Sequence, residues 1–207
     1  MSGRTEGVTD TPSLAELRAQ AAQCRACDLW ERATQTVFGE GDESAAVMLI
    51  GEQPGDREDL EGAPFVGPAG QLLDRALKDA RLDRAGVYVT NAVKHFKWTP
   101  RGKRRIHQRP TQEEIRACRP WLEKEIAVVR PRILVCMGVT AAVSVIGKNV
   151  RIMRDRGEFF PTELGPVATV TLHPSAVLRA PDEQGRHQQY EVLLEDLRRV
   201  AERVQSG

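Results

Sequence analysis

The stretch Ala45-Ala-Val-Met-Leu-Ile50, followed at once by Gly51-Glu-Gln-Pro-Gly55, decides the fold class. An apolar run that ends in a turn bounded by glycine and proline is typical of a strand buried on both faces of a parallel sheet. Three further short apolar runs follow, at 87–90, 133–136 and 167–172, with amphipathic helical patterns between them. The sequence therefore predicts one α/β domain, with three αβα layers around a central, mostly parallel, four-stranded sheet.

The composition is that of a globular domain. The chain has 207 residues, 41% of them hydrophobic, and a net charge of +1. Its longest wholly apolar run, 45–50, is far shorter than the roughly 18 residues of a membrane span, and the N-terminus lacks the apolar segment of a secretory signal. We therefore expect a cytoplasmic monomer without membrane association. Residues 1–12 are expected to form a flexible tail and residues 13–207 the domain.

Four polar segments come directly after the predicted strands. They are Gly51–Gly55, Asn91-Ala-Val-Lys94, Cys136-Met-Gly138 and His173-Pro-Ser175. In parallel sheets, ligands bind beyond the carboxyl ends of the strands. We therefore expect these segments to meet at one edge of the sheet, although they are far apart in the sequence.

The four cysteines indicate a metal or cluster site. Cys24 and Cys27 form a C-x-x-C pair, and Cys118 and Cys136 follow much later. In a reducing compartment such a set favours metal ligation over disulfides. The residues alone do not choose between zinc and an iron–sulfur cluster, and Cys136 has the alternative of a buried strand cysteine.

The segment 94–110 is expected to be a basic loop that binds an anionic partner. It contains no acid between Lys94 and Arg109 and has aromatic residues, Phe96 and Trp98, among its cations. Aromatic and basic side chains together suit single-stranded nucleic acid, where bases stack and phosphates need charge. The alternatives are a solvated loop or a half-buried strand that continues from residue 93.

Five polar or aromatic residues stand out as candidates for chemistry. Glu52 lies in the first turn, Asn91 and His173 follow strands, Phe65 lies in a loop, and His107 lies among cations that should lower its pKa. A neutral imidazole is a nucleophile, and an amide can pair with the edge of a base. Each residue also has an ordinary alternative, as a turn residue, a core residue or a phosphate contact.

Taken together, these motifs resemble the uracil-DNA glycosylase superfamily, in its iron–sulfur family-four type. The resemblance rests on GEQPG at 51–55, PFVGPAG at 64–70, TNAVKHFK at 90–97, HPS at 173–175 and the cysteine positions. Gln53 and the segment KRRIH at 103–107 make it most similar to the UdgX branch, which cross-links to uracil-DNA.

The resemblance implies a [4Fe–4S] cluster held by Cys24, Cys27, Cys118 and Cys136. It also implies that uracil is flipped out of the DNA, which is expected to be single-stranded. Phe65 would stack on the base and Asn91 would pair with its edge. The resemblance also implies that the backbone at Gln53 and the side chain of His173 stabilise the uracil anion and that Glu52 lies near the sugar. The residues expected to contact DNA are Lys94, Lys103, Arg104, Arg105 and Ser175, with placement of the loop as the alternative role of Arg104 and Arg105.

In that branch a histidine, matched here by His107, bonds to C1′ of the abasic sugar in place of water. The resemblance thus implies a single-turnover glycosylase in which Glu52 orients the imidazole and accepts its proton. Two other functions stay open from the residues: a conventional hydrolytic glycosylase, and a non-catalytic protein that binds single-stranded or damaged DNA. A zinc hydrolase is poor chemistry, because four thiolates leave no open metal position.

Overall fold

The computed structural model describes residues 12–147 and 149–206, so the predicted flexible tail lies, apart from Pro12, outside the described residues. The chain begins with α1 (Leu14–Ala21), and Ser13 and Glu16 form the capping box that starts it. The later elements are η1 (Asp28–Glu31), β1 (Val47–Gly51), α2 (Asp56–Glu61), α3 (Pro68–Asp79), η2 (Arg84–Gly86), β2 (Val87–Asn91), β3 (Trp98–Arg101), β4 (Arg104–His107), α4 (Gln112–Val129), β5 (Ile133–Met137), α5 (Val139–Val145), α6 (Ile152–Asp155), β6 (Phe159–Phe160), β7 (Val167–Thr171), α7 (Pro174–Leu178) and α8 (Glu183–Gln205).

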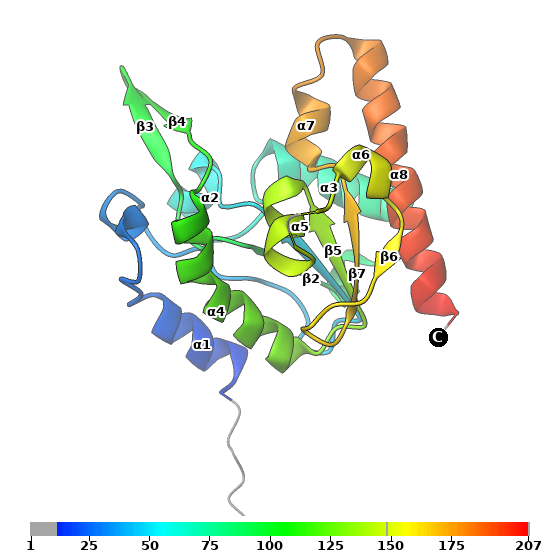
Figure 1. The fold of residues 1–207 in the computed structure, drawn as a ribbon. Coiled ribbons are helices and arrows are strands. Elements are labelled where there is room, and N and C mark those ends of the chain that lie inside the picture. Colours follow the sequence, from blue (N-terminus) through cyan, green and yellow to red (C-terminus); the bar gives the residue numbers. More distant parts are fainter. Residues whose placement is uncertain (1–11, 148, 207) are drawn as a thin grey trace, which may run out of the picture.

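The main sheet has the order β2-β1-β5-β7-β6 (Figure 1). The four predicted strands are confirmed as β1, β2, β5 and β7, and they pair in parallel. The prediction of four strands is short by one, because β6 adds an antiparallel edge strand. At two residues, β6 is too short to leave a periodic pattern in the sequence.

Alternating side chains of the strands face two hydrophobic cores. On one face, Met48 and Ile50 pack with residues of α1, α4 and α5. On the other, Val47 and Leu49 pack with residues of α3 and α8. The helices therefore cover both faces and complete the predicted three layers. Over 12–147 and 149–206, no helix combines the length and the apolar character needed to cross a bilayer.

The basic segment is not an irregular loop. Residues 98–107 form an antiparallel hairpin of β3 and β4, which projects from the body of the molecule above α4 (Figure 1). Its turn contains Gly102, whose positive φ of 60° suits glycine. The hairpin carries His107 at its end, so a separate small element supplies one of the predicted site residues.

Candidate active site

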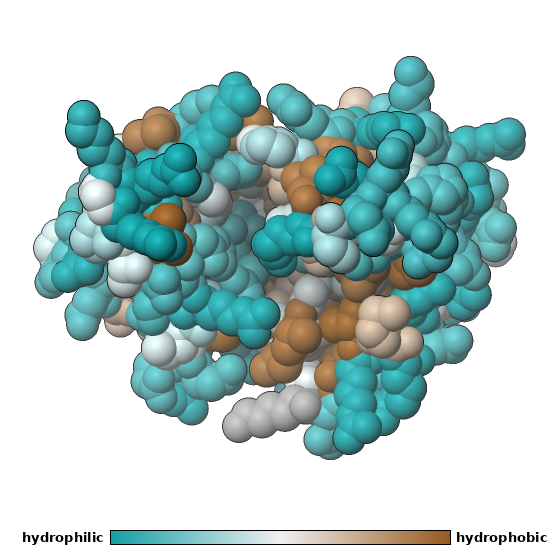
Figure 2. All heavy atoms as spheres, turned by 90° about the horizontal axis from the view of Figure 1, so that it is seen from above, coloured by the Kyte–Doolittle hydropathy of each residue, from teal (hydrophilic) through white to brown (hydrophobic). Residues whose placement is uncertain are grey.

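A cavity of about 780 Å³ lies at the carboxyl ends of the parallel strands, and the predicted meeting of distant segments is confirmed there. The lining residues from those segments are Glu52, Gln53, Asn91, Met137, Gly138, His173 and Ser175, and Phe65 and His107 join them. Figure 2, which views the molecule from above, shows a hollow in this region with apolar side chains among the hydrophilic surroundings.

Gly51 marks the point where three of the predicted side chains converge. A Cβ atom at this glycine would lie 2.3 Å from Asn91 Oδ1, 2.8 Å from Phe65 Cζ and 3.4 Å from His173 Nε2. Gly51 and Asn91 are register partners at the ends of β1 and β2. The glycine therefore leaves room for an amide, an aromatic ring and an imidazole to meet at one place.

The loop before α3 holds Phe65 in the cavity. Phe65 has a φ of 57°, a left-handed conformation that is rare for an aromatic residue. Gly70 permits it, since a Cβ there would lie 1.5 Å from the Phe65 carbonyl oxygen. Glu58 accepts a hydrogen bond from the Gly67 N–H at 3.0 Å and fixes the same loop. The Phe65 ring stacks on His173 with centroids 6.0 Å apart.

His173 is held as a neutral ring. Burial, with help from Arg179 and His107, lowers the pKa of His173 to about 4. Its Nδ1 atom accepts the backbone N–H of Ser175 at 3.1 Å. The proton of the neutral ring is therefore assigned to Nε2, the atom that faces Gly51. His173 thus offers a hydrogen-bond donor to a ligand in the cavity.

His107 and Glu52 form the second centre of the site. His107 Nε2 lies 3.4 Å from Glu52 Oε1, and Thr140 donates a hydrogen bond to Glu52 Oε2. Burial lowers the pKa of His107, Arg179 and Arg109 lower it further, and Glu52 opposes them. The expected direction is confirmed, but the main cause is burial.

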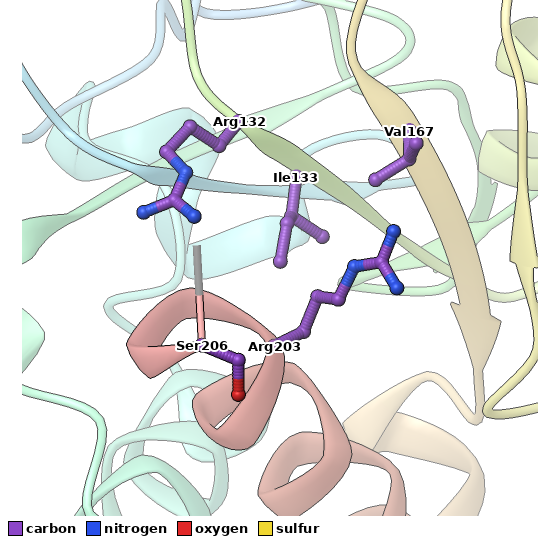
Figure 3. Close-up of a pocket in the computed structure, with 5 residues that line it drawn as sticks. All are labelled: Arg132, Ile133, Val167, Arg203 and Ser206. Atoms are coloured by element: carbon purple, nitrogen blue, oxygen red, sulfur yellow. The ribbon is translucent and has the colours of Figure 1, made fainter.

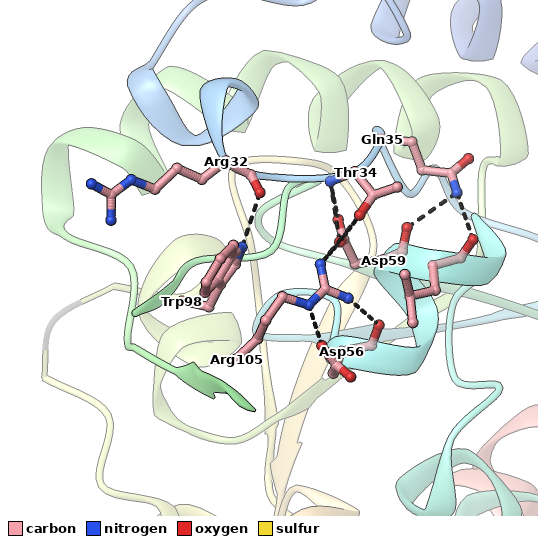
Figure 4. A network of polar contacts seen from close by, with 8 residues as sticks. Arg32, Thr34, Gln35, Asp56, Asp59, Trp98 and Arg105 are labelled. Carbon is pink, nitrogen blue, oxygen red and sulfur yellow. Dashed lines mark hydrogen bonds and ion pairs between the residues drawn. The ribbon is translucent and has the colours of Figure 1, made fainter. Parts of the chain in front are cut away.

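The Arg105 side chain is engaged within the protein, which favours the placement of the hairpin over a phosphate contact as its role. Its guanidinium lies 2.6 Å from Asp59 Oδ2 and also pairs with Asp56 (Figure 4). Asp59 is fully buried and accepts a hydrogen bond from the Thr34 N–H at 3.0 Å. Arg105 thus ties β4 to α2, which gives Asp56 and Asp59 a structural role that the sequence did not reveal.

The Gln53 side chain holds the base of the same hairpin. Its Nε2 atom donates to the carbonyl oxygens of Lys97 and Gln108, at 3.2 and 3.0 Å. Lys97 directly precedes β3 and Gln108 directly follows β4. Gln53 therefore anchors both ends of the hairpin that contains the KRRIH segment.

Lys94 is wrongly predicted to contact DNA. The side chain is only 1% exposed and its Nζ lies 2.5 Å from Glu125 Oε2. It also donates to the Asn91 carbonyl oxygen at 2.7 Å, so it braces the backbone of Asn91. Phe96 is 1% exposed and belongs to the core, which removes it as a stacking platform.

The remaining predicted DNA contacts fall into two groups. Lys103 and Arg104 are exposed at the hairpin turn. Ser175 lines the cavity, and its hydroxyl lies 2.8 Å from His173 Nδ1 and accepts a hydrogen bond from Arg179.

Two residues that line the cavity, Thr140 and Arg179, were not predicted from the sequence. For Arg179 a signal exists, because it lies one helical turn after Ser175.

Three of the four cysteines lie in one region, and Cys136 lies in another. Cys27 packs against the small cluster that contains Cys118, and Cys24 accepts an N–H bond from Trp121 at 3.2 Å. Cys136 is fully buried among the β-sheet core. The predicted four-cysteine set is therefore wrong at Cys136. Within the described ranges, no group of three or more His, Cys, Asp or Glu is placed to hold a single metal ion.

A second cavity, of about 420 Å³, lies at the opposite end of the sheet (Figure 3). Arg132 and Arg203 flank it, together with Ile133, Val167 and Ser206. It contains none of the predicted site residues and no paired acid and base. The chemistry is therefore concentrated at the carboxyl ends of the strands.

Comparison with known proteins identifies the family. The model of the uracil DNA glycosylase superfamily matches residues 38–198. The type-4 uracil-DNA glycosylase of Sulfurisphaera tokodaii is 34% identical over 92% of this chain and 84% of its own length. That of Pyrobaculum aerophilum is 35% identical over 84% of this chain and 89% of its own. A type-5 uracil-DNA glycosylase of Pyrobaculum aerophilum is 32% identical over 63% of this chain and 61% of its own length. The chain belongs to the uracil DNA glycosylase superfamily.

Proposed function

We propose that this protein is a uracil-DNA glycosylase that captures its own product through His107. The observation that carries the proposal is the pairing of two centres in one cavity. Asn91, Phe65 and His173 converge at Gly51 and can receive a flipped uracil, and His107 stands beside Glu52 where the attached sugar would lie. The type-4 glycosylase relatives support the reaction.

Uracil is recognised by shape and by hydrogen bonding. The Phe65 ring offers an apolar face for stacking. The Asn91 amide offers a donor and an acceptor to the O4 and N3–H edge of the base. His173 offers its Nε2–H to the negative charge that develops as the base departs. The backbone at Gln53 is proposed as a second donor, since its side chain is engaged with the hairpin.

The proposed chemistry balances without the proton transfer to Glu52 that the resemblance implies, because Glu52 Oε1 lies beside His107 Nε2, the attacking nitrogen, and the ring proton is on Nδ1. The C1′–N1 bond breaks and uracil leaves with the electron pair as an anion. A neutral His107 with its proton on Nδ1 uses the Nε2 lone pair to form a bond to C1′. The ring becomes an imidazolium, and the Glu52 carboxylate at 3.4 Å stabilises first the cationic sugar and then this ring.

His107 has an advantage over water because the hairpin holds it in place. A positioned nucleophile acts at a high effective concentration, so it reaches the cationic sugar first. Gln53 and Arg105 supply that placement. A stable C1′–imidazole bond leaves no free enzyme, so the protein acts once.

We also propose that the protein holds a [4Fe–4S] cluster, with Cys24, Cys27 and Cys118 as ligands. Backbone and indole N–H groups point at Cys118 and Cys24, as they do at the sulfurs of cluster ligands. His95 is the proposed fourth ligand. It follows Lys94, whose N–H bonds to Cys118, and its Nε2 lies 2.9 Å from Thr36 Oγ1. The Thr36 hydroxyl and the backbone N–H of Cys24 both donate a hydrogen bond to the Ala21 carbonyl oxygen, which places His95 close to Cys24.

The cluster assignment is tested by iron content and visible absorbance of purified variants. Cys136→Ala should keep both, since Cys136 lies in the core. Cys118→Ala should lose them, and His95→Ala should reduce them. Loss of iron in Cys136→Ala with full retention in His95→Ala would reverse the assignment of the fourth ligand.

Uracil in single-stranded DNA is the proposed preferred substrate. A base in a single strand needs no unpairing before it enters the cavity, so flipping costs less than in a duplex. The buried Phe96 lends no support to this preference, which rests on the cost of flipping alone. A duplex of the same sequence provides the comparison.

A denaturing gel tests the function. The protein is mixed with single-stranded oligonucleotides that contain uracil or thymine at one position. A band that survives SDS and heat with uracil alone is expected. His107→Ser should lose the band and release uracil to water instead, while His187→Ser, a change on the exposed surface of α8, should leave the band intact.

The other outcomes separate the competing functions. Alkali-labile DNA without a shifted band would mean a conventional hydrolytic glycosylase. Equal affinity for uracil and thymine DNA without base release would mean a DNA-binding protein that is not an enzyme. A band that persists in His107→Ser would remove His107 as the nucleophile.

A further inference from the structure

Thr140 lines the cavity and has no assigned role in the proposed reaction. It is the second residue of α5 and follows Gly138, whose positive φ of 90° starts that helix close to the strand end. The placement brings its hydroxyl to Glu52, a residue 88 positions earlier in the chain, to which it donates a hydrogen bond.

The Glu52 carboxylate is held at both oxygens. Oε2 accepts the bond from Thr140, and Oε1 faces His107 Nε2 at 3.4 Å. Among the hydrogen bonds of the described residues, Thr140 is the donor to this carboxylate. The Glu52 side chain is 21% exposed, so without Thr140 it has space to rotate toward solvent.

We propose that Thr140 is a positioning residue, which holds the Glu52 carboxylate turned toward the reacting sugar and His107. This inference rests on the proposed function, because it assigns the part that Thr140 plays at the same site. The hydrogen bond from Thr140 fixes the rotamer of the Glu52 side chain, so the charge is in place before the sugar becomes cationic.

Two variants separate the hydroxyl from the shape of the side chain. Thr140→Val keeps the volume and the branching but removes the donor, whereas Thr140→Ser keeps the donor. The single-turnover rate of uracil release is measured in the His107→Ser background, and cross-linking is measured with native His107. Hydrogen bonds to charged groups indicate a loss of about tenfold to a hundredfold for Thr140→Val. Half-saturating DNA concentration should change little, and Thr140→Ser should restore most of the rate.

A second comparison asks whether Thr140 acts through Glu52. In a double-mutant cycle, Thr140→Val added to Glu52→Gln should cause little further loss, because the group that Thr140 positions has already been changed. Independent losses that multiply would contradict the proposal. So would equal losses in Thr140→Val and Thr140→Ser, which would indicate a packing role for the residue.

A readout without substrate keeps the test independent of the proposed reaction. The orientation of the Glu52 side chain is determined from crystal structures of the native protein and of both variants. Thr140→Val should release the Glu52 carboxylate to turn toward solvent, and Thr140→Ser should keep it facing His107. An unchanged Glu52 rotamer in Thr140→Val would overturn the positioning role, even in a protein with normal activity. Failure of the native protein to release uracil would instead overturn the proposed function.

Discussion

The sheet edge and the hairpin build the two halves of this site in different ways. At the sheet edge, Asn91 ends a strand that is buried on both faces and is only 3% exposed. At the hairpin, the His107 side chain is 47% exposed, and β4 pairs only with β3. The first half is fixed by the core, and the second by a few polar contacts to α2 and to Gln53.

This difference implies that the proposed base recognition and the proposed capture are separable. Asn91, the residue proposed to pair with the base, cannot move without disturbing the packing of β1 and β2, which share the core. The hairpin can lose its anchor while the core stays intact. Changes at the sheet edge should therefore abolish all activity, and changes at the hairpin should reduce capture more than base release.

The largest effect is expected at Gly51. Gly51→Ala places a Cβ within 2.8 Å of both Asn91 and Phe65, so uracil cannot take its position. We expect uracil release and cross-linking to fall together by more than about a hundredfold, since an ångström of misplacement costs that much. Single-turnover assays measure both, and thermal melting reports the fold. Gly86→Ala is the matched control, because nothing lies within 4 Å of its Cβ position. Retained activity in Gly51→Ala would place the base elsewhere.

A smaller and selective effect is expected at Arg105. Arg105→Ala leaves the fully buried Asp59 without its charged partner and loosens the hairpin. Cross-linking should fall by about tenfold to a hundredfold, and uracil release by much less. Quantified gels and a uracil-release assay measure the two rates. Arg198→Ala removes the same charge from the exposed surface of α8 and serves as the control. Equal losses of release and cross-linking in Arg105→Ala would show that the halves are not separable.

The pH dependence of capture tests the environment of the hairpin half. The pKa of His107 is lowered, so the neutral nucleophile persists as pH falls through 6.5 and is lost only below the lowered value. A histidine at the ordinary pKa would lose about fourfold of its neutral form between pH 7.5 and 6.0. The second-order rate of cross-linking should fall by less than this over the same range. A full fourfold fall would contradict the lowered pKa of His107.

The smallest effect is expected from the hairpin turn. Lys103 and Arg104 are exposed, and each is expected to neutralise one phosphate. The logarithm of the binding constant for single-stranded DNA falls linearly with the logarithm of the salt concentration. Replacing both residues by glutamine should make this slope less negative by about 1.4, or about 0.7 for each phosphate. Fluorescence anisotropy with a thymine oligonucleotide measures it without chemistry. An unchanged slope would remove the turn from the DNA interface.

Much of the sheet-edge half could be predicted from the sequence. Four strands could be predicted from the sequence, because a strand buried on both faces is a continuous apolar run. Asn91 and His173 could be placed because each follows such a run, and parallel strands end at one edge. The hairpin could not be predicted from the sequence, because short exposed strands rich in Arg and Lys lack a periodic apolar pattern.

The sequence by itself determined the fold class, the edge at which the site lies and the family-like set of site residues. Only the tertiary structure decided which way the polar side chains point. Lys94 turns inward to Glu125, 31 residues away, and Arg105 turns inward to Asp59, 46 residues away. Cys136 turns into the core, away from the other thiols. A local pattern gives the position of a charge along the chain, but burial of that charge requires a partner, and distant segments supply it only after they pack.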